Sequence, residues 1–342
     1  MNKRQLQSDV PFDQYSRQFQ VKTIIDCLRQ KDQSFKLLDV GGYKGRTADF
    51  LPSDQVTVMD LFDVKEPGYV KGSALEMPFK DGSFDYIVSF DVLEHIPSSK
   101  RPTFIKECVR VAKRGVIICA PHKTIANEVA EKALNDMYKR LHDEEHRWLK
   151  EHIAYGIPDF SEVEKRLQKQ GLQTVAFPSN KTSLWVSMQQ AIFTNSQYSL
   201  AAEQLTKLNT YYNRHFEYDG GESAEGSYRQ ILCGFADQKA AELVAAAFGT
   251  MNKAIPADAE IDLFEQLHGY YETLLAKMHA LQNDYKGLHE HEKNRAAELE
   301  ANGKQLWQRL NDQDRQIQEL RMRATPLTVR IGHKVRRRLR RR

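Results

Sequence analysis

A long heptad repeat near the C-terminus constrains the fold of this chain more than any other feature. Apolar residues alternate steps of three and four over about four heptads, lapse over residues 292–302, and resume with a shift of four residues. No proline lies between Pro256 and Pro326. A helix over residues 261–321 would be roughly 90 Å long at ~1.5 Å per residue, so a compact domain could not cover its apolar side. The seam consists of Phe264, Leu267, Tyr271, Leu274, Met278, Leu281, Tyr285 and Leu288, followed by Leu306, Leu310, Ile317 and Leu320.

This seam predicts a coiled coil over residues 261–325, and with it a homo-oligomer of this chain. A helical hairpin that folds back onto the rest of the protein is the alternative. Tyrosine and methionine in the seam do not distinguish two strands from three.

The charge of the chain is concentrated at its end. Residues 326–342 contain seven Arg, one Lys and no acid, which is a charge of +8 in a chain of net charge +4, so the other residues sum to −4. Apolar residues alternate with these charges, and a basic amphipathic tail of this kind suits an anionic membrane surface. Nucleic-acid binding and a disordered solubilising end are the alternatives.

The remaining composition is typical of a cytoplasmic protein. At 342 residues the chain is long enough for about two domains, and no run of ~18 apolar residues could span a membrane. The N-terminal sequence MNKRQLQSDVPFDQ lacks the apolar middle of a signal peptide. Cys27, Cys108, Cys119 and Cys233 are scattered, without a disulfide framework or metal-ligand spacing. We expect a cytoplasmic protein that can lie on the inner face of the cytoplasmic membrane.

The first 240 residues alternate short apolar runs with helical patterns, which is typical of an α/β domain with a parallel sheet. Helices are predicted at 19–30, 101–113, 124–152 and 161–170, and strands at 36–42, 56–62, 115–121, 172–178 and 228–237, with a further strand running into a turn over 84–96. The helical stretch 182–217 is interpreted as an insertion before the last strand. The α/β domain would then span residues 1–240, with a linker or helix over 241–260.

The strand-turn sequence LLDVGGYKG at residues 37–45 is the first candidate ligand site. Its glycines allow a strand to stop abruptly and the following backbone to approach a ligand. Asp39, two residues before Gly41, suits a cationic ligand with a free amino group and would repel a pyrophosphate. Asp60 ends the next strand, where an acid can accept hydrogen bonds from ribose hydroxyls. A tight turn without a ligand is the alternative.

Further along, GSALEMPFKDGSFDYIVSFDVLEHI at residues 72–96 and ECVRVAKRGVIICAP at 107–121 follow in order. Together with the glycine turn and Asp60, they resemble the class I methyltransferases over about residues 35–121. The resemblance implies a Rossmann-like, doubly wound sheet and S-adenosyl-L-methionine as the cofactor.

The resemblance also implies a set of cofactor-binding residues. Two positions depart from the family pattern: Tyr43 replaces the middle glycine of the loop, and Ser73 replaces an acid beside the adenine. Asp91 lies where the family's chain passes the methionine moiety. The implied cofactor-binding residues are Asp39, Gly41, Gly45, Asp60, Ser73, Ala74 and Asp91.

Phe12, Tyr15 and Phe19 precede this region at helical spacing. They could cover the cofactor, or they could pack the first helix on the sheet. We favour packing.

The methyl acceptor is sought among the polar residues that follow the fourth and fifth strands, since open sheets of this type bind ligands there. A base is needed only if the acceptor is a hydroxyl. His146 and His152 are the first candidates and His122 the next, within a group that also includes Glu94, His95, His142, Glu145 and Glu151.

The spacing of His142 and His146 would place both side chains on one helix face. Such a pair could hold a metal ion, but the sequence fixes no third ligand, so we predict no metal site. A solvated helix face and a role in substrate binding both remain open.

The organisation of the chain resembles bacterial enzymes of cell-surface polysaccharide assembly, in which a methyltransferase acts on a lipid-linked glycan. This resemblance favours a sugar hydroxyl, in a glycan or a related small molecule, as the acceptor. The acidic body argues against broad nucleic-acid binding, and Cys119 within a strand is poorly placed as a nucleophile. The alternatives are a nucleic-acid or protein methyltransferase recruited by the tail, and a non-catalytic scaffold.

Overall fold

The computed structural model describes residues 3–43, 46–219, 223–251 and 258–324, in two compact units, Met1–Leu274 and Leu275–Arg342. Gly45 and the basic tail lie outside the described residues, and so does the coiled-coil end at residue 325.

The first unit is built on a seven-stranded sheet with the order β3-β2-β1-β4-β5-β7-β6. Strand β7 runs antiparallel to both of its neighbours, and the other pairs are parallel. The predicted α/β, Rossmann-like doubly wound fold is therefore confirmed, with one short strand, β3, that the sequence did not indicate. The strands are β1 Lys36–Val40, β2 Gln55–Asp60, β3 Tyr69–Lys71, β4 Phe84–Phe90, β5 Ala112–Pro121, β6 Gln173–Lys181 and β7 Ser227–Phe235.

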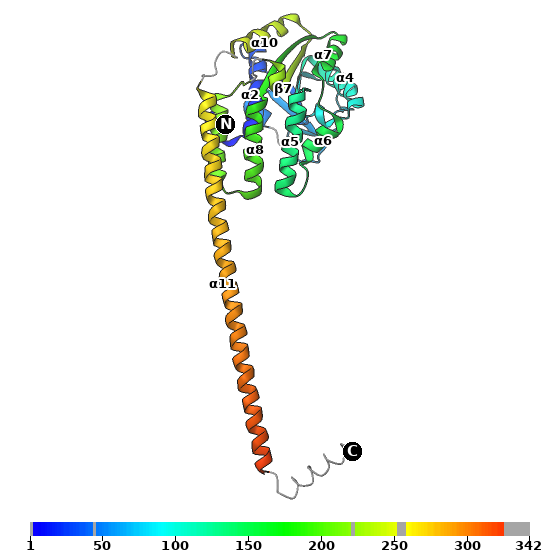
Figure 1. The fold of residues 1–342 in the computed structure, drawn as a ribbon. Coiled ribbons are helices and arrows are strands. Elements are labelled where there is room, and N and C mark those ends of the chain that lie inside the picture. The colour runs from blue at the N-terminus through cyan, green and yellow to red at the C-terminus, as the bar shows by residue number, and fades with distance from the viewer. Residues whose placement is uncertain (1–2, 44–45, 220–222, 252–257, 325–342) are drawn as a thin grey trace. The chain divides into compact units, whose positions relative to one another are not determined.

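Helices cover both faces of the sheet because its central strands are apolar on both sides. Helices α2 (Phe12–Leu28) and α10 (Gln238–Met251) pack on one face through residues such as Ile24 and Val244. Helices α4 (Arg101–Val111) and α7 (Phe160–Lys169) pack on the other, through residues such as Phe104 and Leu167 (Figure 1). Phe12 and Tyr15 are 0% and 1% exposed. Both are buried, but Phe12 packs against Tyr212 and Tyr15 lies in a cluster with Leu6, Val10 and Phe50, so they do not pack on the sheet as favoured from the sequence.

The remaining helices of this unit are α1 Lys3–Asp9, α3 Thr47–Phe50, α5 Ile125–His142, α6 Arg147–Tyr155, α8 Thr182–Tyr198 and α9 Ala202–His215, with 3-10 turns η1 Leu93–His95, η2 Ser98–Lys100 and η3 Ala224–Gly226. Helices α8 and α9 fall between β6 and β7, as expected for the insertion. The helix predicted over 124–152 is interrupted, because Asp143 adopts φ 60° and ends α5. His142 and His146 therefore do not share one helix face.

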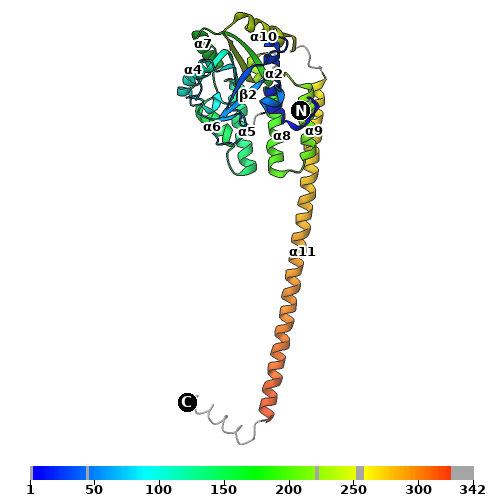
Figure 2. The same cartoon turned by 180° about the vertical axis from the view of Figure 1, so that it is seen from behind.

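The first compact unit extends to Leu274, beyond the boundary at residue 240 expected from the sequence. Leu263, Leu267 and Tyr270, at the start of α11, are buried, and the Tyr270 hydroxyl donates a 2.8 Å hydrogen bond to the Ala191 carbonyl oxygen in α8. Figure 2 shows α8, α9 and this part of α11 side by side. Of the first seam residues, Leu267 and Leu274 are thus buried within the unit while Phe264 is 47% exposed, so the docked side of α11 overlaps the seam only in part.

Helix α11 (Ala259–Ala324) is one continuous helix of 66 residues. Beyond Leu274 its large apolar side chains are exposed, among them Leu281 (54%), Tyr285 (71%) and Leu288 (66%). Oligomerisation through this row stays a prediction. None of the helices in the described ranges combines the length and the apolar character needed to cross a membrane.

Candidate active site

The glycine turn after β1 lies directly against the segment that follows β4. Gly41 adopts φ +76°, and its amide donates a 2.7 Å hydrogen bond to the Met59 carbonyl oxygen in β2. A Cβ atom at Gly41 would lie 2.3 Å from Cγ2 of Val92. Any side chain at this position would push the turn away from the end of β4.

Asp39 is buried beneath this turn. Its carboxylate accepts a hydrogen bond from the Thr47 hydroxyl. Burial raises the pKa of Asp39 to about 6, although the Thr47 hydrogen bond and the charge of Arg17 oppose the shift. A Cβ atom at Gly42 would lie 2.3 Å from this carboxylate, so Gly42 makes the room that Asp39 needs. This role of Gly42 is not apparent from the sequence.

Asp60 ends β2 and supports the glycine turn through its carboxylate. Oδ2 accepts a 3.2 Å hydrogen bond from the Tyr43 amide, and Oδ1 accepts one from the Leu61 amide at 2.6 Å. The Tyr43 ring packs against Phe62 and Tyr69, with ring centroids 4.9 Å and 6.0 Å away. Tyr43 therefore contributes an aromatic wall beside the acid that is expected to hold the ribose.

The two positions expected beside the adenine follow β3. The Ser73 hydroxyl accepts a 3.2 Å hydrogen bond from the Leu75 amide, and Ala74 packs against the core on the α4 side of the sheet. Ser73 thus shapes its own turn in the structure.

Asp91 follows β4 at φ 50° and is held by two arginines. Oδ2 lies 2.6 Å from Arg17 Nη1, and Oδ1 accepts a 2.7 Å hydrogen bond from Arg229 Nε. Burial alone would raise the pKa of Asp91, but Arg17 and Arg229 lower it to about 2. Arg229 also pairs with Asp13 at 2.8 Å. The Asp91 carboxylate therefore anchors α2 and β7 to the carboxyl end of β4.

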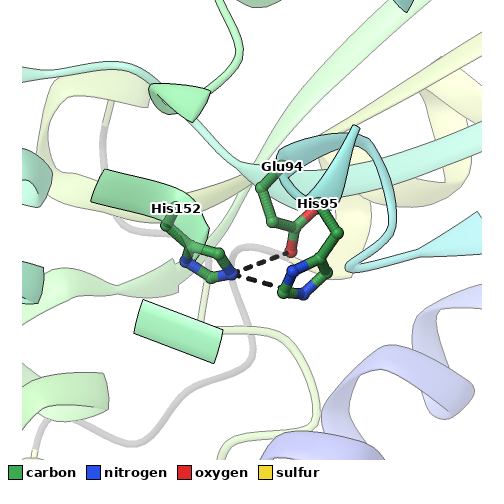
Figure 3. Close-up of side chains that lie close together, drawn as sticks. All are labelled: Glu94, His95 and His152. Atoms are coloured by element: carbon green, nitrogen blue, oxygen red, sulfur yellow. Dashed lines mark hydrogen bonds and ion pairs between the residues drawn. The ribbon is translucent and has the colours of Figure 1, made fainter. Parts of the chain in front are cut away.

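A cluster of Glu94, His95 and His152 lies just beyond Asp91 (Figure 3). Glu94 and His95 belong to η1, and His152 reaches them from α6. The His152 and His95 Nε2 atoms are 3.3 Å apart, and His152 Nε2 lies 4.0 Å from Glu94 Oε1. Because the glycine turn contacts Val92, this Glu94–His95–His152 cluster stands next to the expected cofactor site.

Two further carboxylates orient the histidine rings of the cluster. His152 Nδ1 lies 2.9 Å from Glu131 Oε1, and His95 Nδ1 lies 2.9 Å from Glu151 Oε2. Glu131 also accepts a 2.8 Å hydrogen bond from the Tyr228 hydroxyl. Each imidazole is thus held at one nitrogen, with its other nitrogen directed into the cluster.

The electrostatics of the cluster shift the pKa values of its members in different directions. Burial and the neighbouring Asp91 raise the pKa of Glu94 to about 8. Burial alone would lower the pKa of His152, but Glu131 and Glu94 raise it. Burial and His152 lower the pKa of His95. Perturbed groups packed together at the end of a sheet are typical of a functional site.

The structure brings only one of the three predicted catalytic histidines, His152, into this cluster. His146 caps α6, where Nδ1 accepts a 3.5 Å hydrogen bond from the Leu149 amide, and burial lowers its pKa to about 4. His122 follows β5, and its Nδ1 is buried without a hydrogen-bond partner among the described residues. Glu131 was missed, because nothing in the local sequence connects it with a histidine 21 residues away.

Comparison with known proteins identifies the domain that carries this site. Residues 38–120 match the family model of the methyltransferase domain. The chain is 27% identical over 174 residues to a demethylmenaquinone methyltransferase of Bacillus pumilus, which covers 46% of this chain and 72% of that protein. It is 28% identical over 127 residues to a probable tocopherol O-methyltransferase of Oryza sativa, which covers 33% of this chain and 31% of that one.

Among solved structures, it is similar to a magnesium protoporphyrin IX methyltransferase from Synechocystis with bound SAH, at TM-score 0.39 and 13% identity, covering 66% of this chain and 84% of that chain. The matched segment 38–120 contains the described acids Asp39, Asp60 and Asp91 and the glycine turn. The chain therefore carries a class I methyltransferase domain and is a methyltransferase that uses S-adenosyl-L-methionine.

Proposed function

We propose that this protein transfers the methyl group of S-adenosyl-L-methionine to a hydroxyl group of a sugar, in a bacterial cell-surface glycan or a related small molecule. The observation that carries the proposal is the Glu94–His95–His152 cluster beside the glycine turn. Methylation of an amine needs alignment alone, whereas a hydroxyl must also lose a proton. A buried arrangement of histidines and carboxylates is suited to that task.

The reaction balances within this site. A bond forms between the acceptor oxygen and the methyl carbon while the bond from that carbon to sulfur breaks, which leaves S-adenosylhomocysteine. The hydroxyl proton is released through the cluster to solvent. Asp39 and Asp60 hold the amino and ribose groups of the cofactor, and His152, fixed by Glu131, is the residue on which deprotonation depends.

The sugar follows from the organisation of the chain and not from its relatives. The relatives carry names of demethylmenaquinone, tocopherol O- and norajmaline N-methyltransferases, so their acceptors differ. A methyltransferase domain followed by a long helix and a basic tail resembles enzymes that act on lipid-linked glycans. Oligomerisation through the exposed row beyond Leu274 would multiply the attachment of the tails to an anionic membrane surface.

Transfer of labelled methyl from S-adenosyl-L-methionine by the full chain tests this function. We expect label in a lipid-linked glycan fraction and none in RNA or protein. The His152→Gln variant should lose the transfer but keep cofactor binding, because the His152 ring pairs with Glu131 and His95 and not with the acids Asp39 and Asp60. His268→Gln is the matched control, since His268 pairs with Glu272 at 3.2 Å on the exposed side of α11. Label in RNA that disappears on deleting residues 326–342 would instead establish the nucleic-acid alternative.

A further inference from the structure

The Glu94–His95–His152 cluster directs the Nε2 atoms of its two histidines at each other. A carboxylate only accepts hydrogen bonds, so Glu131 and Glu151 each require a proton on the Nδ1 atom that they face. A neutral imidazole with its proton on Nδ1 presents a lone pair at Nε2. The two Nε2 atoms lie 3.3 Å apart, so either a shared proton or a metal ion must lie between the two rings.

Glu94, the third member of the cluster, also needs a partner for its carboxylate. Glu94 is 0% exposed, and neither of its carboxylate oxygens has a hydrogen-bond partner among the described residues. A buried carboxyl group without partners is costly. One proton shared between the histidines would leave Glu94 without a partner, whereas a metal ion would satisfy all three side chains.

The distances fit a metal ion. Two ligands bound at ~2.1 Å to one ion are about 3.0–3.4 Å apart at octahedral or tetrahedral angles. The separation of the two nitrogens is 3.3 Å, and Glu94 Oε1 is 4.0 Å from His152 Nε2. The three ligand atoms lie within 4.8 Å of one another, so Glu94 has to move closer to the two nitrogens to complete the set.

We propose that Glu94, His95 and His152 bind one divalent transition-metal ion, such as Zn²⁺ or Mn²⁺. Two nitrogens and one carboxylate suit these ions, and hydrogen bonds from ligating histidines to carboxylates are the usual means of fixing their tautomers. Glu131 and Glu151 are the positioning residues. This site departs from the sequence prediction of no metal, which considered only the spacing of His142 and His146.

A metal ion held by three protein ligands has open coordination positions. Resting on the proposed function, we assign these positions to a hydroxyl of the acceptor, or to two neighbouring hydroxyls of a sugar ring. Coordination lowers the pKa of a bound hydroxyl, so its proton is lost at neutral pH. His95 and His152 then serve as ligands, and the ion takes the place of a side-chain base.

Calorimetric titration of the chelator-treated full chain with Zn²⁺ or Mn²⁺ tests the site directly. We expect one tight ion per chain, and a loss of affinity of at least 100-fold in Glu94→Gln and in His95→Ala. The positioning variant Glu131→Gln should bind 10- to 100-fold more weakly. His268→Gln and Glu272→Gln, the exposed pair on α11, should bind as tightly as the wild type. Absence of tight binding, or equal binding by Glu94→Gln and His95→Ala, would overturn the proposal.

A second measurement needs no variant. The wild-type chain loaded with Co²⁺ should show the visible absorption bands of a low-symmetry nitrogen and oxygen site, and a spectrum identical to aqueous Co²⁺ would refute it. Both measurements omit cofactor and acceptor. A chain that binds the ion but methylates no sugar would therefore refute the acceptor and leave the metal site standing.

Discussion

Replacing Asp91 by asparagine should destabilise the first unit by removing one charge at the junction of α2, β4 and β7. The carboxylate lies 2.6 Å from Arg17 Nη1 and 2.7 Å from Arg229 Nη2. Asparagine keeps the shape of the side chain and can still accept hydrogen bonds, but it leaves both guanidinium groups with less compensation. The Arg229 side chain is only 3% exposed, so water cannot replace the lost partner.

The magnitude follows from the pKa of Asp91, which is lowered from 3.8 to about 2. A difference of this size corresponds to about 2 kcal/mol of stability. Complete loss of one partner from a buried pair costs about 3–5 kcal/mol. Because Arg229 keeps Asp13 at 2.8 Å, we expect a loss of about 2–4 kcal/mol at pH 7.

Urea unfolding of the wild type and Asp91→Asn at several pH values measures this difference. The pKa of Asp91 is lower in the folded state than in the unfolded state. Its contribution to stability is therefore complete above the unfolded value of 3.8 and is lost as the pH falls through about 2. The gap between the two proteins should therefore be constant from pH 7 to pH 5 and narrow below about pH 4. Asp63→Asn is the control, since Asp63 is exposed and 3.7 Å from Lys71. A gap below about 0.5 kcal/mol at pH 7, or one unchanged at pH 3, would refute the reasoning.

Further expectations concern the cofactor, the helix and the tail. The affinity for S-adenosyl-L-methionine, measured by calorimetry, should fall as the pH drops below about 6, because burial raises the pKa of Asp39 to that value and the neutral acid cannot bind an amino group; Asp39→Asn should bind weakly at every pH. Gly42→Ala should weaken the same binding at least tenfold, because its Cβ would lie 2.3 Å from that carboxylate, and unchanged affinity would contradict this. The double variant Leu281→Asp, Leu288→Asp should be a monomer in sedimentation equilibrium. A wild-type chain that is also a monomer would contradict the predicted coiled coil. Deletion of residues 326–342 should abolish flotation with anionic vesicles, whereas retention would place the attachment elsewhere.

The residues of the expected cofactor site could be grouped from the sequence because they lie close together along the chain. Asp39 and Gly41 stand within three residues of each other, and Asp60 ends the next strand of the same parallel sheet. Neighbouring parallel strands bring their carboxyl ends to one edge, so order along the chain is sufficient to assemble these residues.

The residues proposed to act on the methyl acceptor could be brought together only by the tertiary structure. Asp143 at φ 60° ends α5, and α6 then starts in a new direction at the His146 cap. That break takes His146 off the helix that carries His142, although both rings pack on Tyr138, and it brings His152 back to Glu131. A positive φ at an aspartate is permitted but not required by the sequence, so the periodicity over 124–152 indicates one helix where there are two.

The end of the first compact unit, at Leu274 within α11, also depended on the tertiary structure. Steps of three and four place apolar residues on one side of α11, and this much the sequence determined, although Leu263 and Tyr270, which the predicted seam leaves out, are also buried. It could not determine what that side contacts, because a helix docking on its own domain and a helix pairing with another copy bury the same pattern. Only the tertiary structure shows Leu267 and Leu274 buried within the first unit, while Leu281 and Leu288 are exposed. Periodicity is a property of one helix, whereas burial depends on the surface that it meets.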